Sequence, residues 1–134
     1  MRPEVKKLLL DVLDSSRSIQ QRCADQTLEQ YASDRWFRRG VEREFEIIGE
    51  ALNRLSQLAP EVAGRIHSLR RIVDFRNRII HGYDSVDDTI VWGVVESSLP
   101  TLIAEVTILL KAAEVEEAEE DERVRLIDVN KPDK

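Results

Sequence analysis

The sequence has little cysteine and few aromatic residues. Cys23 is the only cysteine, so the chain cannot form an intramolecular disulfide or a cysteine-rich metal cluster. Aromatic residues make up 5% of the chain, with 5 glycines and 4 prolines, which is too few for an all-β protein with many turns. No apolar run reaches the roughly 18 residues that suggest a membrane-spanning helix. We expect no membrane association and a cytoplasmic location, because residues 1–7 also lack the apolar core of a signal peptide.

The net charge of −6 is unevenly distributed along the chain. Residues 114–134 contain 9 acidic and 4 basic residues, whereas residues 1–113 carry a net charge of only −1. Between positions 65 and 83 the balance reverses, with five arginines against a single acidic residue, Asp74. The acidic character therefore belongs to the C-terminal tail, and the basic central segment is compatible with an anionic ligand.

Apolar residues recur at a spacing of 3.6, which predicts an all-α protein built as an up-and-down bundle of four to five helices. We expect long helices over residues 3–22, 35–58, 68–80 and from about 86 to 113. Thr27 and Gln30 have the spacing of a capping box that begins a short helix, and Ser33 or Asp34 can cap the next helix. Pro60 should end the third helix. Gly82 occupies the usual position of a left-handed C-terminal cap.

Two residues interrupt the expected helices. Gly49 lies inside the third helix, where glycine costs about 1 kcal/mol relative to alanine, and either close approach of another helix or chance would explain it. Pro100 should kink the last helix or split it in two. Beyond Glu114 we expect one or two further helical turns and then a flexible tail. The predicted domain therefore covers residues 1–113, and the acidic tail covers residues 114–134.

The segment that can carry chemistry runs from Asp74 to Tyr83. Asn77 and His81 are four residues apart, so they share a helix face and can hydrogen-bond. Arg76 precedes His81 by five residues, about 140° around the helix, so the two can flank a bound group. Arginine offers a fork of donors to a phosphate, and histidine transfers protons near neutral pH.

This residue set is suited to cleavage of RNA without a metal ion or cofactor. The 2′-hydroxyl of RNA is an internal nucleophile, and its attack would leave a cyclic phosphate and a 5′-hydroxyl. One histidine cannot easily act as base and acid at once, so a symmetric homodimer that supplies two would be economical. We expect Arg76 and His81 to lie outside the core, so that replacing either would abolish activity without unfolding the protein.

Each residue also has a purely structural interpretation. A histidine at the end of a helix is usually matched to the helix dipole, helix arginines are usually solvated, and Tyr83 after a glycine is usually a core or rim aromatic. Glu46 and Glu50 could act as an acid–base pair, but pairing with arginines of their own helix is simpler. His67 has no partner in the sequence pattern and is expected at the surface. Cys23 is expected to behave as a small apolar side chain.

The sequence resembles the HEPN superfamily, and within it the HepT-like toxin branch. The similarity rests on the Arg-x4-His-x-Tyr pattern of Arg76, His81 and Tyr83. It also rests on the opening Met-Arg-Pro, the Glu-Ile-Ile-Gly-Glu-Ala stretch at positions 46–51, and the pairs Val-Trp at 91–92 and Leu-Pro at 99–100. It covers residues 1–112. The connection at positions 60–67 is shorter than is typical of this branch, which can reshape one wall of a groove.

The resemblance implies a ribonuclease toxin encoded beside a minimal nucleotidyltransferase (MNT-type) antitoxin. By this similarity Arg76 and His81 are catalytic and Asn77 and Arg78 support them. Tyr83 would receive AMP from the antitoxin, which would silence the toxin. The basic residues Arg70 and Arg71 are candidates for RNA binding.

Three hypotheses follow for the function. The first is an active dimeric endoribonuclease toxin, which the intact motif favours. The second is a HEPN domain that binds nucleotide, RNA or a nucleotidyltransferase without cutting. The third is a structural helical interaction module, which predicts that changing His81 has no functional effect.

Overall fold

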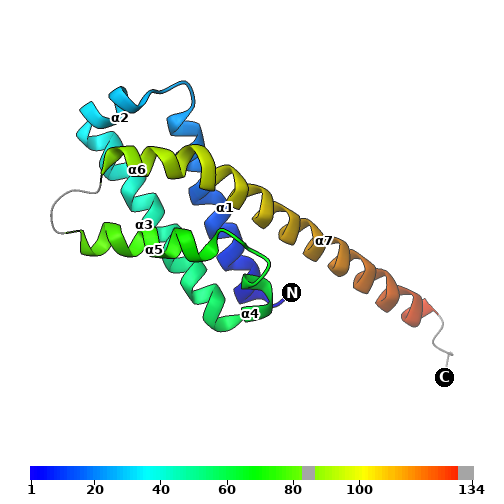
Figure 1. Ribbon diagram of the computed structural model, residues 1–134. Coiled ribbons are helices and arrows are strands. Elements are labelled where there is room, and N and C mark those ends of the chain that lie inside the picture. Colours follow the sequence, from blue (N-terminus) through cyan, green and yellow to red (C-terminus); the bar gives the residue numbers. More distant parts are fainter. Residues whose placement is uncertain (83–86, 130–134) are drawn as a thin grey trace.

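The computed structural model describes residues 1–82 and 87–129, and every element within them is a helix (Figure 1). In chain order they are α1 (Pro3–Cys23), α2 (Leu28–Ser33), α3 (Arg35–Leu58), α4 (Pro60–Ala63), α5 (Leu69–His81), α6 (Asp88–Gly93), the π-helical turn η1 (Val94–Ser98) and α7 (Leu99–Val129). The predicted all-α bundle is confirmed. The bounds of α1, α3 and α5 agree with the predicted helices to within one residue, and the short helix α4 was not predicted.

The predicted caps form at the starts of α2 and α3. The Thr27 hydroxyl accepts from the Gln30 backbone N–H at 3.1 Å, and the Gln30 amide oxygen accepts from the Thr27 N–H at 2.8 Å, which completes the capping box of α2. Asp34 caps α3 by accepting from the Phe37 N–H at 3.1 Å. These bonds satisfy backbone donors that the first helical turn leaves free, so both helix starts are fixed by local sequence.

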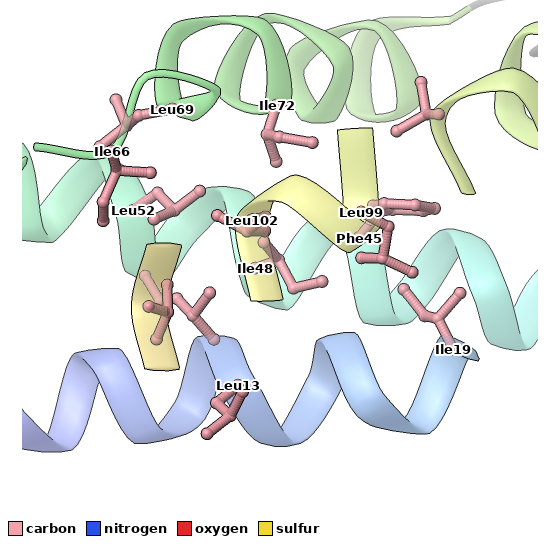
Figure 2. Close-up of a cluster of buried hydrophobic side chains, with 14 of the residues drawn as sticks. Leu13, Ile19, Phe45, Ile48, Leu52, Ile66, Leu69, Ile72, Leu99 and Leu102 are labelled. Atoms are coloured by element: carbon pink, nitrogen blue, oxygen red, sulfur yellow. The ribbon is translucent and has the colours of Figure 1, made fainter. Parts of the chain in front are cut away.

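The core lies where α1, α3, α5 and α7 meet. Figure 2 shows apolar side chains from these helices pointing toward one another. The labelled residues are all buried: Leu13, Ile19, Phe45, Ile48, Leu52, Ile66, Leu69, Ile72, Leu99 and Leu102. Cys23 belongs to the same cluster, and burial raises the pKa of its thiol to about 11, so the group stays protonated at neutral pH. Burial of these aliphatic residues stabilises the bundle and fixes the rotation of each helix.

Aromatic side chains hold α6 against the N-terminal end of α3. Tyr31 of α2 is fully buried, and its ring centroid lies 5.2 Å from that of Phe37 and 5.5 Å from that of Trp92 in α6. Aromatic rings in such contacts add stabilisation beyond the burial of their area. Trp92 therefore anchors the short helix α6, which forms one side of the candidate site.

The last helix changes direction at η1 (Figure 1). Pro100 has no N–H and would collide with the carbonyl four residues earlier in a regular α-helix. The backbone forms a π turn just before it, and the Leu99 N–H donates to the carbonyl of Val94. The predicted interruption at Pro100 is therefore confirmed, and it takes the form of a widened turn.

Beyond the core, α7 continues as a helix to Val129, so the prediction of only one or two turns after Glu114 is wrong. An ion pair between Lys6 of α1 and Glu117, 3.3 Å apart, holds the start of this extension. By length and hydropathy alone, the helical stretch Asp88–Val129 could cross a membrane, and 44% of its most apolar window is buried inside the bundle. A core helix of a bundle has the same properties.

Candidate functional site

Helix α5 carries the candidate residues, and a carboxylate of α7 fixes its start. Glu105 accepts from the backbone N–H of His67 at 2.7 Å and from the Ser68 hydroxyl at 2.9 Å. The carboxylate therefore holds the two residues that precede Leu69, the first residue of α5, and the Ser68 side chain forms no cap of its own. His67 lies at the surface, as expected, and its Nδ1 lies 3.2 Å from a carboxylate oxygen of Glu105, a contact with α7 that the sequence pattern does not reveal.

The buried face of α5 sets the direction of its other side chains. Leu69, Ile72, Val73 and Phe75 are buried. The Phe75 ring meets Phe45 of α3 edge to face, with centroids 5.0 Å apart. Since side chains rotate by about 100° per residue along a helix, this packing turns Arg76 toward α3 and leaves Arg78 and His81 at the surface.

Arg76 lies against α3 and is half-buried. A Cβ placed on Gly49 would come closer than 3.0 Å to the Cβ and Cγ of Arg76, so the two helices approach at this glycine. One guanidinium nitrogen of Arg76 donates to Asn77 Oδ1 at 3.0 Å, and its Nε is buried without a hydrogen-bond partner among the described residues. Arg76 therefore packs against α3 without belonging to the buried core, and His81 is exposed, so both lie outside the core as expected.

A groove runs between α5 and the α6–η1 segment, which we call the α5–α6 groove. It consists of two adjoining hollows of ≈ 490 and ≈ 450 Å³ that share Asp74, Phe75, Arg78 and Ile90. Asn77 and His81 line the larger hollow, and Arg71 lines the smaller one. The groove is therefore bordered by two arginines, a histidine and an amide, with the carboxylates of Asp74 and Asp87 among them.

Two local predictions about the end of α5 are wrong. Gly82 has φ −74° and ψ 97°, which is extended backbone and not the left-handed cap that was predicted. Asn77 forms no hydrogen bond with His81, and its amide oxygen instead accepts from Arg76. His81 is thus placed at the rim of the groove by helix geometry alone.

The structure brings together only part of the predicted site. Arg71, Asn77, Arg78 and His81 line the α5–α6 groove, whereas Arg70 and Arg76 do not. Tyr83 lies outside the described residues. Within the part of the chain that is described, no three His, Cys, Asp or Glu side chains are grouped so as to hold a metal ion.

Sequence reasoning missed several contributors to this region, among them Asp74, Asp87, Ile90 and Ser97. Asp74 lines both hollows, and its position three and four residues before Asn77 and Arg78 could have placed it on their face. Ile90 and Ser97 come from α6 and η1, and no local signal in the sequence places them opposite α5. On α3, Arg39 and Arg43 form ion pairs with Glu42 and Glu46 of the same helix, which supports the expected pairing of Glu46 with an arginine of its own helix.

Comparison with known proteins identifies similar chains. The model of a family described as "Ribonuclease HepT-like" matches residues 12–109. A Methanocaldococcus jannaschii protein provisionally named an RNase is 27% identical over 118 residues, covering 85% of this chain and 93% of the relative. A Thermococcus cleftensis protein provisionally named ribonuclease HepT is 28% identical over 106 residues, covering 76% and 92% of the two chains. No solved structure gives a significant match.

Proposed function

Because the chain belongs to the HepT-like ribonuclease family of the HEPN superfamily, we propose that it is a metal-independent endoribonuclease and the toxin of a toxin–antitoxin system. The observation that carries the proposal is the α5–α6 groove, in which Asn77, Arg78 and His81 lie together in a chain that matches this family. The groove is open to solvent, and its arginines can bind the phosphates of an RNA strand.

In the proposed reaction, a nitrogen of His81 accepts the proton of an RNA 2′-hydroxyl. The 2′-oxygen attacks the adjacent phosphorus, the bond to the 5′-oxygen breaks, and the products are a 2′,3′-cyclic phosphate and a 5′-hydroxyl. The leaving 5′-oxygen takes a proton from the His81 of a second copy, and Arg76 stabilises the negative charge that develops on the phosphoryl oxygens. Arg71 and Arg78 bind flanking phosphates, and Arg70 extends the basic surface.

A homodimer is part of this proposal. A single chain offers one groove histidine, and Arg76 does not line the groove of its own chain. Ile90 lines the groove and is 44% exposed, and Ile80, elsewhere on α5, is 46% exposed. Such apolar side chains are suited to burial against a second copy. The two-fold axis would then bring two sets of Arg76 and His81 to one composite site.

Silencing by an MNT-type nucleotidyltransferase completes the proposal. The enzyme would transfer AMP from ATP to the hydroxyl of Tyr83, with release of pyrophosphate. Tyr83 follows His81 by two residues in the sequence, so the added phosphodiester would obstruct the groove and repel an RNA phosphate.

One observation favours a second candidate, a HEPN domain that binds RNA, nucleotide or a nucleotidyltransferase partner without cutting. Arg76 is half-buried and already bonded to Asn77. If Arg76 stays bonded to Asn77, the site could still bind an anion through Arg71 and Arg78. It would then lack the arginine that stabilises the transition state of cleavage.

The test is cleavage of RNA in the presence of EDTA by the protein purified without its nucleotidyltransferase. His81→Ala should lower the rate by about 10²–10⁴-fold, the range for loss of general acid–base catalysis. His67→Ala changes the other histidine of the chain and should leave the rate unchanged. The products of the wild type should end in cyclic phosphate.

Two outcomes would replace the proposal by the second candidate. One is the absence of cleavage by unmodified wild-type protein, and the other is equal cleavage by wild type and His81→Ala. Light scattering on the same sample tests the composite site, because a strictly monomeric active enzyme contradicts catalysis across a dimer.

A further inference from the structure

Gly49 differs from the other helical glycines in what surrounds it. A Cβ at Gly40 in α3 or at Gly93 in α6 would meet no atom within 4 Å. A Cβ at Gly49 would come closer than 3.0 Å to the Cβ and Cγ of Arg76, and to 3.1 Å from its Cδ. The glycine is therefore required at position 49 by the approach of α5, whereas the other two positions have room for alanine.

The atoms that would collide are those closest to the backbone of α5. The Cβ of Arg76 is fixed to the helix, so rotation of the distal side chain cannot make room for it. An added methyl group at position 49 must therefore push α5 away from α3 or turn it. Phe75, next in sequence to Arg76, packs against Phe45 in the same interface, so a local shift would also disturb this aromatic contact.

The guanidinium of Arg76 is held from two sides. Its aliphatic stem rests on the backbone at Gly49, and one terminal nitrogen is bonded to Asn77 Oδ1 at 3.0 Å. Its Nε is buried, so only the terminal end of the group is left to meet a ligand. Because Gly49 has no side chain, the Arg76 stem can lie against α3, and this contact determines the position of the guanidinium relative to α3 and α5.

We propose that Gly49 is a positioning residue for Arg76. The glycine lets α5 approach α3 so closely that the Arg76 stem lies against the α3 backbone, and this holds the guanidinium where it meets an RNA phosphate. The inference rests on the proposed function, since it assigns the ligand of Arg76 as an RNA phosphate. A displacement of about 1 Å in such a group can lower a reaction rate about 10²-fold.

The first measurement is RNA binding, made in a His81→Ala background so that no strand is cut. Fluorescence anisotropy with a labelled single-stranded oligoribonucleotide gives the affinity at several salt concentrations. Loss of one phosphate contact lowers the slope of log K against log salt by about 0.7. We expect this loss for Arg76→Ala and for Gly49→Ala, and no further loss when the two are combined. Gly40→Ala, in the same helix, should leave the slope unchanged.

The second measurement is cleavage by the same changes with His81 intact. Gly49→Ala should reduce kcat by about 10²-fold, and Gly40→Ala should not change it. A Gly49→Ala protein with wild-type salt slope and kcat overturns the inference. A loss that simply adds to that of Arg76→Ala also overturns it, because Gly49 would then act through other groups.

A third measurement covers the case in which Gly49→Ala does not fold. Arg76→Gly removes the two atoms with which the new methyl group collides, so Gly49→Ala combined with Arg76→Gly should recover the unfolding midpoint of Arg76→Gly alone. No recovery overturns the inference. If folded wild type and every variant fail to bind RNA, the proposed function fails and the phosphate role of Arg76 fails with it. The recovery experiment then reports on the contact between Gly49 and Arg76 alone.

Discussion

The two faces of α5 differ in how they meet the rest of the molecule. Toward α3, Ile72 and Phe75 are buried, and at Gly49 no additional carbon atom fits between the helices. Toward α6 and η1, the same helix borders open hollows of ≈ 490 and ≈ 450 Å³, with Arg78 and His81 at their edge. One helix of 13 residues thus combines a tightly packed face with one that leaves polar groups to solvent.

The face of α5 that packs against α3 contributes to stability, and the face that borders the groove carries the polar groups available for chemistry. The packed face fixes the position and rotation of α5, and its apolar contacts would dominate the cost of mutation. The open face has polar side chains that can change with little effect on folding. Arg76 lies between the two, since its stem belongs to the packed side and its charged end does not.

The largest effect is expected from Phe45→Ala on the packed side. Phe45 is fully buried, and its ring meets Phe75 with centroids 5.0 Å apart. Removing it leaves a cavity under α5 and should lower the free energy of unfolding by about 3–5 kcal/mol. Chemical denaturation followed by circular dichroism measures this loss, and a loss below about 1 kcal/mol would contradict close packing of this face.

A smaller loss is expected from Glu105→Ala, which leaves the start of α5 without its carboxylate. The backbone N–H of His67 and the hydroxyl of Ser68 lose their acceptors. A hydrogen bond to a charged group contributes about 1.5–3 kcal/mol, and water replaces part of it at this partly exposed place, so we expect a loss of about 2 kcal/mol. Glu105→Gln keeps one acceptor oxygen, so its free energy of unfolding should lie between those of the wild type and Glu105→Ala. Equal stability of all three proteins would show that the contacts of Glu105 do not stabilise the start of α5.

A gain is expected from Gly40→Ala, which adds a methyl group where no neighbour stands within 4 Å. Alanine is favoured over glycine inside a helix by about 1 kcal/mol, so the free energy of unfolding should rise by about this amount. The contrast with Gly49 is sharpened if Gly49→Ala lowers the stability under the same conditions. If Gly40→Ala instead lowered the free energy of unfolding, helix propensity would not be the main contribution to stability at this exposed position of α3.

The smallest effect on stability is expected from His81→Ala on the open side. His81 is exposed and has no hydrogen bond within residues 1–82 and 87–129. Surface changes of this kind usually alter the free energy of unfolding by less than about 0.5 kcal/mol. Thermal unfolding of wild type and variant gives the comparison, and a loss above about 1 kcal/mol would make His81 a structural residue.

Sequence reasoning predicted those parts of the fold that depend on local chemistry. The capping box at Thr27, the cap at Asp34 and the stop at Pro60 follow from hydrogen-bonding groups and backbone restrictions within a few residues. Apolar periodicity gave the extents of α1 and α3. The length of α7 was underestimated because charged residues beyond Glu114 do not reveal whether a helix continues.

The candidate site was harder to predict, because it depends on contacts between helices. The i,i+4 spacing placed Asn77 and His81 on one face but could not show that Arg76 would occupy the Asn77 oxygen. Gly49 was noticed as costly in a helix, yet only the crossing of α3 and α5 identifies Arg76 as its neighbour. The opposite wall of the groove, with Ile90 and Ser97, comes from elements whose placement depends on tertiary packing.

The π turn at Val94–Ser98 has a consequence for evolution by insertion and deletion. A wide turn holds one residue more than an α-helical turn, so removing one residue from it would restore α-helical winding. Each residue rotates an α-helix by about 100°. Because the wide turn already contains one residue more than an α-helical turn, losing that residue would leave the later side chains facing the same way. A chain that instead lost one residue from the regular part of α7 would turn Val106 and Leu110 out of the core. Length variation among relatives should therefore be tolerated at positions 94–98 and excluded from the buried part of α7, which ends at Ala113.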